Sequence, residues 1–553
     1  MPKTNRYVIA LVAALGLIPV VIDLTIVTVA LVSIRTDLKT DINTAQWIVT
    51  GFFLANAATI TVGGYLANRF GRKRLFILGV AAFTAGSVAC GLAPGIGWLI
   101  AFRVLQGIGG GILLPLGPAL AFDAFPREER ARASAVIGIP ILMAPVFGPI
   151  IGGYLNDAFG WHSIFFLNVP FGILAVVAGL VALPRDARDE AQQAHRARFD
   201  YLGLALSTLG IAAIVYALKV VTQTDPSTVT AANPAGSLYG WSYWLVWALL
   251  GGGVVALGGF TVYALRISRD PALDLRQLGR RDFLVSNLVT WSTSLFGFGL
   301  LVLLPIYFEA VRLPLLSARD TGIALVPLGV GTLAGTIVAT ALYRAAGPRV
   351  TAMGGAACIA ISAYLFAQTI HATADASQLL AAARGSAPVP AVAGPDALRW
   401  ELLLLGLGIA IASVTVQTLA LEALKGEALA KASSLYLSTK LLVSSIGVAI
   451  ITTLLIDRSR SRAGELAGQL QALLAAANPG GAGSAGAPPA AALRAVEAQL
   501  AVQAGTWAIQ GIFWLIFFAS LGLVALALLL PGRQRRLAPA EQPADEPLAV
   551  AGM

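Results

Sequence analysis

The chain is a succession of long apolar runs separated by short polar segments. Fourteen runs reach about 20 residues, the length that an α-helix needs to cross the hydrocarbon core of a bilayer. They lie near 7–32, 46–67, 75–93, 97–122, 133–156, 163–183, 201–221, 242–265, 283–309, 320–343, 350–370, 400–424, 431–456 and 506–530. The pattern therefore predicts an all-α polytopic membrane protein with 14 transmembrane helices.

Composition and charge agree with this prediction and give it an orientation. The chain is 57% hydrophobic and only 12% charged, against about 25% charged residues in soluble domains. If the N-terminus is cytoplasmic, the inner loops and tails hold 25 of the 38 Lys and Arg residues and the outer loops hold 10. Cytoplasmic loops of membrane proteins are enriched in Lys and Arg. We therefore expect a multi-pass protein of the cytoplasmic (inner or plasma) membrane with both termini cytoplasmic.

The polar interruptions suggest how the helices are grouped. A basic turn after the second run, Gly64–Arg74, has a loose counterpart at Leu342–Arg349, which favours two six-helix halves with two helices inserted between them. The predicted divisions are an N-terminal six-helix bundle (1–183), a cytoplasmic linker (184–200), two inserted helices (201–265), a C-terminal six-helix bundle (283–530) with an outer loop (457–504), and a cytoplasmic tail (531–553).

Two long outer segments are rich in alanine, glycine and proline. Residues 371–398 and 457–504 contain too few large apolar side chains to pack a core. We expect flexible loops there, with short amphipathic helices beside the Gly/Pro tract of the second segment.

Asp23 and Arg103 are charged residues inside apolar runs. An ionised aspartate in lipid costs about 2.5–3.5 kcal/mol, so Asp23 must face protein or water. At about 1.5 Å per residue, Asp23 lies roughly 14 Å and Arg103 roughly 9 Å from the outer ends of their runs, so they can share a layer. The two residues form either a proton-coupling pair, in which the arginine tunes the proton affinity of the carboxylate, or a permanent structural salt bridge.

Small residues recur in the fifth run. Ala144, Gly148 and Gly152 are spaced by four, with Pro145 and Pro149 between them. Such a face lets a second helix approach closely, and the prolines permit a bend. We predict that this helix packs closely on a neighbouring helix and moves against it, and we call the contact a seam. The same spacing also occurs in static bundles.

Three further polar residues are candidates for a central cavity: Gln106, Glu309 and Lys440. Glu309 has an alternative interpretation as half of an interfacial pair with Arg312. Gln106 could instead bond a neighbouring helix.

Several function classes lack their sequence signals. There is no Gly-x4-Gly-Lys-[Ser/Thr] loop for ATP, and the basic residues are dispersed among short loops rather than clustered for nucleic acid. The three histidines are scattered, and no Ser/His/Asp arrangement is supported. We therefore expect no enzyme activity, no cofactor and no metal, and a lipid bilayer as the surroundings.

At this point the motifs resemble a known family, the fourteen-helix drug:proton antiporters of the major facilitator superfamily. The resemblance covers essentially the whole chain. The matching segments are Asp23–Leu31, Gly64–Lys73, Arg103 with Gln106 and Gly107, Gly148–Gly153, Trp161–Gly172 and Phe199–Gly203.

The resemblance implies a role for each segment. Asp23 and Arg103 would act in proton coupling. The loop after the second helix would help to gate conformational exchange through Gly64, Asn68, Arg69, Gly71, Arg72 and Lys73, and Asn68 departs from the aspartate usual there. Ala144, Gly148, Pro149, Gly152 and Gly153 would form the antiporter seam.

The resemblance also implies a function. We expect a monomeric proton-coupled antiporter that exports drugs, antibiotics or similar amphipathic molecules by alternating access, with a small-molecule substrate and protons as its partners. Export of an endogenous lipid or metabolite, proton-coupled import, and a non-transporting scaffold are the alternatives.

Overall fold

The structure is a computed structural model of the whole chain. It describes residues 5–125, 147–184, 200–221, 223, 239–268, 275–312, 314–371, 376–383, 392–422, 426–477 and 490–532. Among the predicted site residues, Ala144 lies outside this part of the chain.

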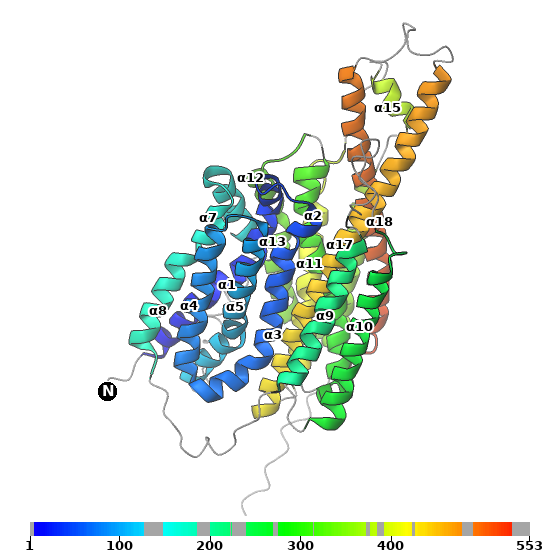
Figure 1. The fold of residues 1–553 in the computed structure, drawn as a ribbon. Coiled ribbons are helices and arrows are strands. Elements are labelled where there is room, and N and C mark those ends of the chain that lie inside the picture. Colours follow the sequence, from blue (N-terminus) through cyan, green and yellow to red (C-terminus); the bar gives the residue numbers. More distant parts are fainter. Residues whose placement is uncertain are drawn as a thin grey trace, which may run out of the picture.

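Each of the 14 predicted runs contains helix in the described residues, although the fifth run (133–156) is described only from residue 147 onward. Figure 1 shows these helices packed side by side. The first six are α1 (Arg6–Asp37), α3 (Trp47–Phe70), α4 (Arg72–Gly91), α5 (Ile96–Ala124), the helix at 147–159, and α7 (His162–Phe166) with α8 (Asn168–Ala182). The next two are α9 (Tyr201–Val221) and α10 (Trp244–Val262), which η4 (Tyr263–Ile267) continues. The last six are α11 (Arg281–Ile306) with η6 (Tyr307–Val311), α12 (Ala318–Ala324) with α13 (Val326–Ala346), α14 (Pro348–Thr369), α16 (Arg399–Glu422), α17 (Gly426–Ala477) and α18 (Ala490–Ala527).

Length and hydropathy make these segments suitable for a membrane. In the described part of the chain, 12 helices are long and apolar enough to cross a bilayer, and α3 carries a shorter apolar stretch. The prediction of an all-α polytopic protein is confirmed.

Two sets of six helices repeat one packing pattern. In the first set α5 packs against α1, α3 and α4, and α4 also packs against α8. In the second set α16 packs in the same way against α11, α13 and α14, and α14 packs against α18. The sets meet where α17 packs on α3 and where α1 contacts α11 and α12. The domain boundaries given above stay predictions.

The two basic turns have the same local geometry. Gly71 joins α3 to α4 with φ 85°, and Gly347 joins α13 to α14 with φ 85°, a conformation open mainly to glycine. Two residues later, Lys73 donates to the carbonyl oxygen of Leu180 (2.9 Å) and Arg349 donates to that of Leu530 (2.8 Å). Each cation thus caps the C-terminal end of the last helix of its set.

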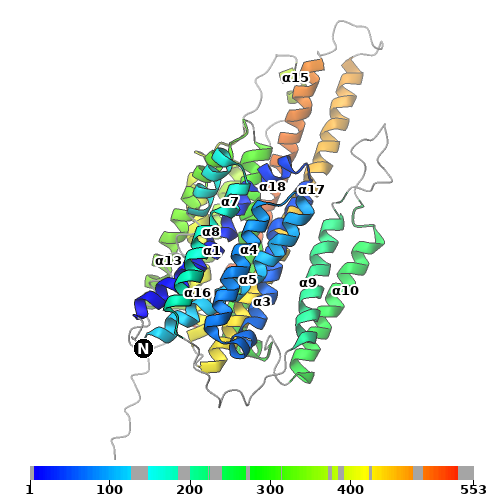
Figure 2. The ribbon, with the colours of Figure 1, turned by 60° about the vertical axis from the view of Figure 1, so that its left-hand side comes forward.

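Helices α9 and α10 form a hairpin of their own beside the two sets (Figure 2). Besides each other, α9 contacts α17 and α3. Most of α10 is exposed in the isolated chain, as expected of a helix that faces lipid.

The prediction of helices beside the Gly/Pro tract of 457–504 is confirmed, but the prediction of a flexible loop is wrong for the described part, because these helices are long continuations of transmembrane helices. Helix α17 continues to Ala477 and α18 begins at Ala490, so both project beyond the bundle as a hairpin (Figure 1). The short helix α15 (Ala376–Ala383) lies against them. The physical reason is a small buried apolar cluster, formed by Leu379, Leu466, Leu470, Val496 and Leu500. Apolar residues at helical spacing therefore outweigh the alanine-rich composition.

We predict that Gly347→Ala destabilises the protein by about 1–3 kcal/mol, because an L-residue is strained at this φ. The matched control is Gly354→Ala in the following helix, where an added Cβ meets nothing within 4 Å. Thermal unfolding in detergent, followed by tryptophan fluorescence, should show a lower midpoint for Gly347→Ala and an unchanged or higher one for the control. Equal midpoints would contradict the prediction.

Candidate functional site

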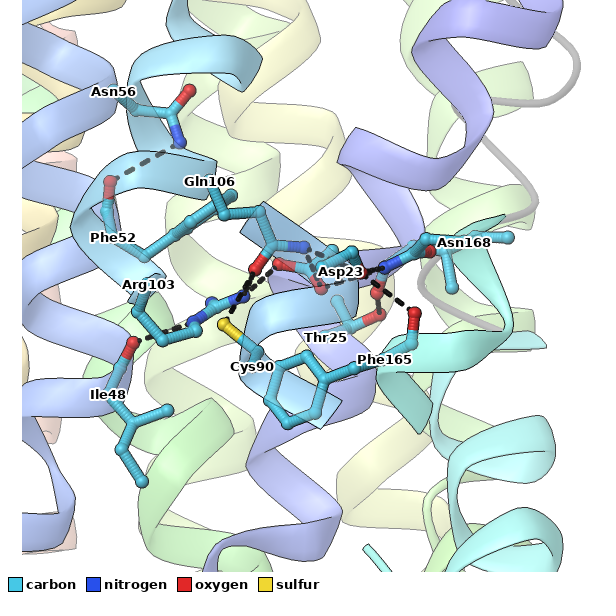
Figure 3. A network of polar contacts seen from close by, with 12 residues as sticks. Asp23, Thr25, Ile48, Phe52, Asn56, Cys90, Arg103, Gln106, Phe165 and Asn168 are labelled. Atoms are coloured by element: carbon cyan, nitrogen blue, oxygen red, sulfur yellow. Dashed lines mark hydrogen bonds and ion pairs between the residues drawn. The ribbon is translucent and has the colours of Figure 1, made fainter. Parts of the chain in front are cut away.

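Asp23 and Arg103 meet in the interior of the first helix set (Figure 3). Asp23 lies on α1 and Arg103 on α5, and each side chain belongs to a residue that is only 1% exposed. The Arg103 guanidinium donates through Nη1 to Asp23 Oδ2 as a buried ion pair. The prediction that the two residues share one layer is confirmed.

The second oxygen of Asp23 is also satisfied. Its Oδ1 accepts from Gln106 Nε2 at 3.2 Å and from Asn168 Nδ2 at 3.2 Å. These donors come from α5 and α8. An ionised carboxylate only accepts hydrogen bonds, so three donors aimed at Asp23 match its charged form.

Arg103 is held on its other sides as well. Its Nε donates to the carbonyl oxygen of Ile48 at 3.0 Å. The guanidinium carbon lies 4.0 Å from the centroid of the Phe52 ring and 5.8 Å from that of Phe165, as cation–π contacts require. The fixed guanidinium therefore presents its charge to Asp23 in one orientation.

Ser87 connects the remaining polar groups. Its hydroxyl donates to the carbonyl oxygen of Phe165 (2.8 Å) and accepts from Gln106 (3.2 Å) and Asn168 (3.0 Å). The Cys90 thiol lies 3.7 Å from Gln106 Oε1, which also accepts from Arg103 at 2.7 Å. The network thus joins α1, α3, α4, α5, α7 and α8, and its cost of burial is offset because its members bond one another.

Glycines bring the helices close enough for these bonds. A Cβ on Gly86 of α4 would lie 2.8 Å from the backbone N of Gln106, and one on Gly107 would lie 2.7 Å from Phe52 O. One on Gly111 would lie 2.5 Å from Asn56 O. Real Cβ atoms do not approach this closely, so only glycine permits the observed spacing. The glycines of α5 are packing residues.

The predicted seam packs on α1 beside Asp23. A Cβ on Gly148 would collide with Thr25 Oγ1, and one on Gly152 would lie 2.6 Å from Ile26 Cγ1. The helix at 147–159 therefore rests on the turn of α1 that follows Asp23.

The same helix also contacts the second helix set. We call this contact the outer seam, because the Lys and Arg distribution predicts that it lies on the outer side. A Cβ on Gly153 would collide with Ala318 O, and one on Gly322 would collide with Pro149 O. The outer seam is thus the contact of residues 147–159 with α12, and backbone touches backbone there. The end of α1 that follows Asp23 contacts α12 as well.

The candidate gating residues are only partly described. Gly71 and Lys73 form the turn and the cap described above, and Arg72 is exposed. The side chains of three others lie outside the described residues: Gly64, Asn68 and Arg69.

The candidate cavity residues do not form one group. Gln106 is buried in the Asp23 network, Lys440 is half-buried on α17, and Glu309 is buried on η6. Arg312 donates to Pro314 O at 3.3 Å, and the structure records no ion pair between Arg312 and Glu309. The interfacial-pair interpretation of Glu309 is therefore wrong.

Three members of the network were not predicted: Ser87, Cys90 and Asn168. Asn168 lies within the Trp161–Gly172 segment quoted above, so that segment carried a signal without indicating its partner. Ser87 and Cys90 carried none, because small polar residues are common in apolar helices.

Comparison with known proteins gives one family. Residues 13–448 match the model of the Major Facilitator Superfamily. The multidrug resistance protein B homolog of Mycobacterium tuberculosis is 32% identical over 435 residues, which cover 78% of this chain and 73% of that protein. The multidrug export protein EmrB of Escherichia coli K12 is 30% identical over 443 residues, which cover 79% of this chain and 78% of that protein. The probable actinorhodin transporter of Streptomyces coelicolor is 30% identical over 446 residues, which cover 78% of this chain and 69% of that protein.

Solved structures agree on the fold. A bacterial homologue of the human lysosomal transporter Spinster, in an inward-facing and unoccupied conformation, superposes with a TM-score of 0.59 at 16% identity, covering 96% of this chain and 98% of that chain. The xylose transporter XylE of Escherichia coli, in a partially occluded inward-open conformation, gives 0.54 at 13% identity and the same coverage.

We predict that Arg103→Gln destabilises the protein by about 3–5 kcal/mol, because Asp23 is left as a buried charge without its partner. Adding Asp23→Asn to the same chain should recover most of the loss, since the amide carries no charge. Detergent melting curves of the wild type, the two single variants and the double variant measure the coupling. Additive effects of the two substitutions would show that the ion pair is not what holds this site.

Proposed function

The chain belongs to the Major Facilitator Superfamily, and we propose that it is a proton-coupled antiporter that exports drugs, antibiotics or similar amphipathic small molecules by alternating access. The observation that carries the proposal is the buried ion pair of Asp23 and Arg103. A charged pair inside a membrane is costly, and its usual purpose is to handle ions or protons.

The proton would bind at Asp23. In the described state the carboxyl group accepts hydrogen bonds from Arg103, Gln106 and Asn168, an arrangement that suits an ionised carboxylate. A movement that separates Arg103 from Asp23 removes the compensating charge, so the carboxylate gains affinity for a proton. Restoring the contact expels that proton. Coupling then requires only that Asp23 is open to one side of the membrane when Arg103 is in contact with it and to the other side when Arg103 has moved away.

The seam supplies the mechanical link. Gly148 and Gly152 press the helix at 147–159 against α1 beside Asp23, and the same helix forms the outer seam with α12. A rotation that opens the outer seam must therefore displace the support of α1. We infer that opening and closing of the outer side alters the Asp23–Arg103 contact in this way.

The substrate class follows from the relatives. Proteins named for multidrug resistance and multidrug export are 32% and 30% identical to this chain over most of its length. A relative named as a probable actinorhodin transporter, at 30% identity, favours a second candidate function, the export of an endogenous metabolite. Both candidates use the same proton site and differ in the molecule carried.

The remaining parts of the proposal concern topology and energy source. We place both termini in the cytoplasm, from the Lys and Arg distribution, and treat the monomer as the transporting unit. Moving one charge through 100 mV supplies about 2.3 kcal/mol, enough for roughly a fortyfold substrate gradient at about 1.4 kcal/mol per tenfold. Transport would therefore need no nucleotide.

We predict that Asp23→Asn abolishes substrate-triggered proton release, and with it the roughly fortyfold gradient that one proton supports. Everted membrane vesicles that carry a proton gradient and a pH-sensitive dye, supplied with a panel of amphipathic antibiotics and dyes, measure this directly.

The control for this experiment is Glu465→Gln, which removes an exposed carboxylate on the outer hairpin. It should release protons like the wild type. Full proton-coupled export by Asp23→Asn at equal expression would refute the proton site. Proton release by the wild type with metabolites alone would favour the second candidate function.

A further inference from the structure

Glu309 is a buried carboxyl group that the proposed mechanism does not use. It lies on η6, a π-helical turn at the outer end of α11, and is 7% exposed. Its Oε1 is buried without a hydrogen-bond partner.

The groups that face Glu309 come from two other elements. Thr321 on α12 lies beside it, and Asp157 on the helix at 147–159 is the charged group close enough to act on it. Thr321 Oγ1 is also buried without a partner. A threonine hydroxyl can donate to an ionised carboxylate and accept from a neutral carboxyl group, so Thr321 can serve both states of Glu309.

No cation compensates Glu309 in the described part of the chain. Arg312, on the same turn, donates to Pro314 O. Arg319 of α12 lies 5.9 Å from the centroid of the Tyr154 ring and is exposed, as is Asp320. Helix α18 reaches η6 through Gly505, which lies against Val311. The charged group that acts on the buried Glu309 is thus another carboxylate, that of Asp157.

This position coincides with the outer seam. Asp157 Oδ2 accepts from the backbone N of Arg319 at 3.0 Å, so it links the first helix set to α12 of the second. Glu309 and Asp157 therefore belong to different helix sets, and both lie beside α12 where those sets are closed. When both carboxylates are ionised, their repulsion pushes the sets apart, and a proton on Glu309 removes that repulsion.

We propose that Glu309 is a second proton-binding site, and that its protonation holds the outer seam closed while its ionisation opens the seam. The proposal rests on the alternating-access part of the proposed function, but not on Asp23. A carboxyl at the outer side is reached by protons from outside once the seam opens. Proton binding there then returns the transporter to its outward-closed state.

The test is a distance measurement across the outer seam in the full-length protein. Nitroxide labels at Phe159→Cys and Leu315→Cys, both exposed positions that flank the seam, are placed in a Cys358→Ala background, where Cys90 is buried. Pulsed electron paramagnetic resonance in nanodiscs follows the distance from about pH 5 to about pH 9. We expect the wild type to change from a short to a long distance as the pH rises, and Glu309→Gln to keep the short distance throughout.

The matched control is Glu401→Gln. Glu401 is equally buried at the outer end of α16 and also has one oxygen without a partner, but its other oxygen accepts from Thr369 within the second helix set. It should leave the pH-dependent change intact. Asp157→Asn should reduce or abolish the pH-dependent opening, because the charge that repels ionised Glu309 is lost.

Two outcomes would overturn the proposal. They are a wild-type distance that does not respond to pH, and a Glu309→Gln protein that opens with pH like the wild type. Gel filtration and an unchanged short distance at low pH verify that Glu309→Gln is folded. Because the readout is a distance, loss of the pH response in Glu309→Gln supports this site even if Asp23→Asn retains antiport, in which case the proposed role of Asp23 alone fails.

Discussion

The structure depends on one electrostatic constraint, that a charge inside the apolar interior must have its partner in place. Asp23 and Arg103 satisfy this for each other, and Gln106 and Asn168 complete the coordination of the carboxylate. Six helical elements contribute groups to this small region. A site assembled from so many elements is sensitive to their relative positions, because a shift of any one of them breaks a hydrogen bond between buried groups. That sensitivity is what a transporter needs.

In the proposed mechanism, close backbone contact converts helix movement into a chemical change at this site. The seam glycines allow the helix at 147–159 to touch α1 on one side and α12 on the other, so one rigid element lies between the ion pair and the second helix set. Asp157 lies near the far end of that same element, and Glu309 lies on η6 of the second helix set. Two carboxyl sites coupled by one helix offer a physical route for protons to bias both the inner and the outer steps of a transport cycle.

Much of the fold could be predicted from the chain because its signals are local. Run length set the number of spans, and the glycines at 71 and 347 marked two turns that share one backbone conformation. The hairpin of α17 and α18 could not be predicted in this way. Its alanine-rich composition resembles a loop, and its stability comes from Leu379, Leu466 and Val496, which are far apart in the chain. Composition alone does not show whether such residues find one another.

The candidate functional site shows the same division between what local sequence signals predict and what long-range contacts decide. The sequence by itself determined that Asp23 and Arg103 lie inside spans, because a charged residue in an apolar run is visible locally. Only the tertiary structure decided that they are paired across 80 residues, that Asn168 joins them from 145 residues away, and that Glu309 has Asp157 rather than Arg312 as its charged neighbour. The physical reason is that burial and hydrophobicity act on each residue separately, whereas a hydrogen bond or an ion pair depends on where two helices place their side chains.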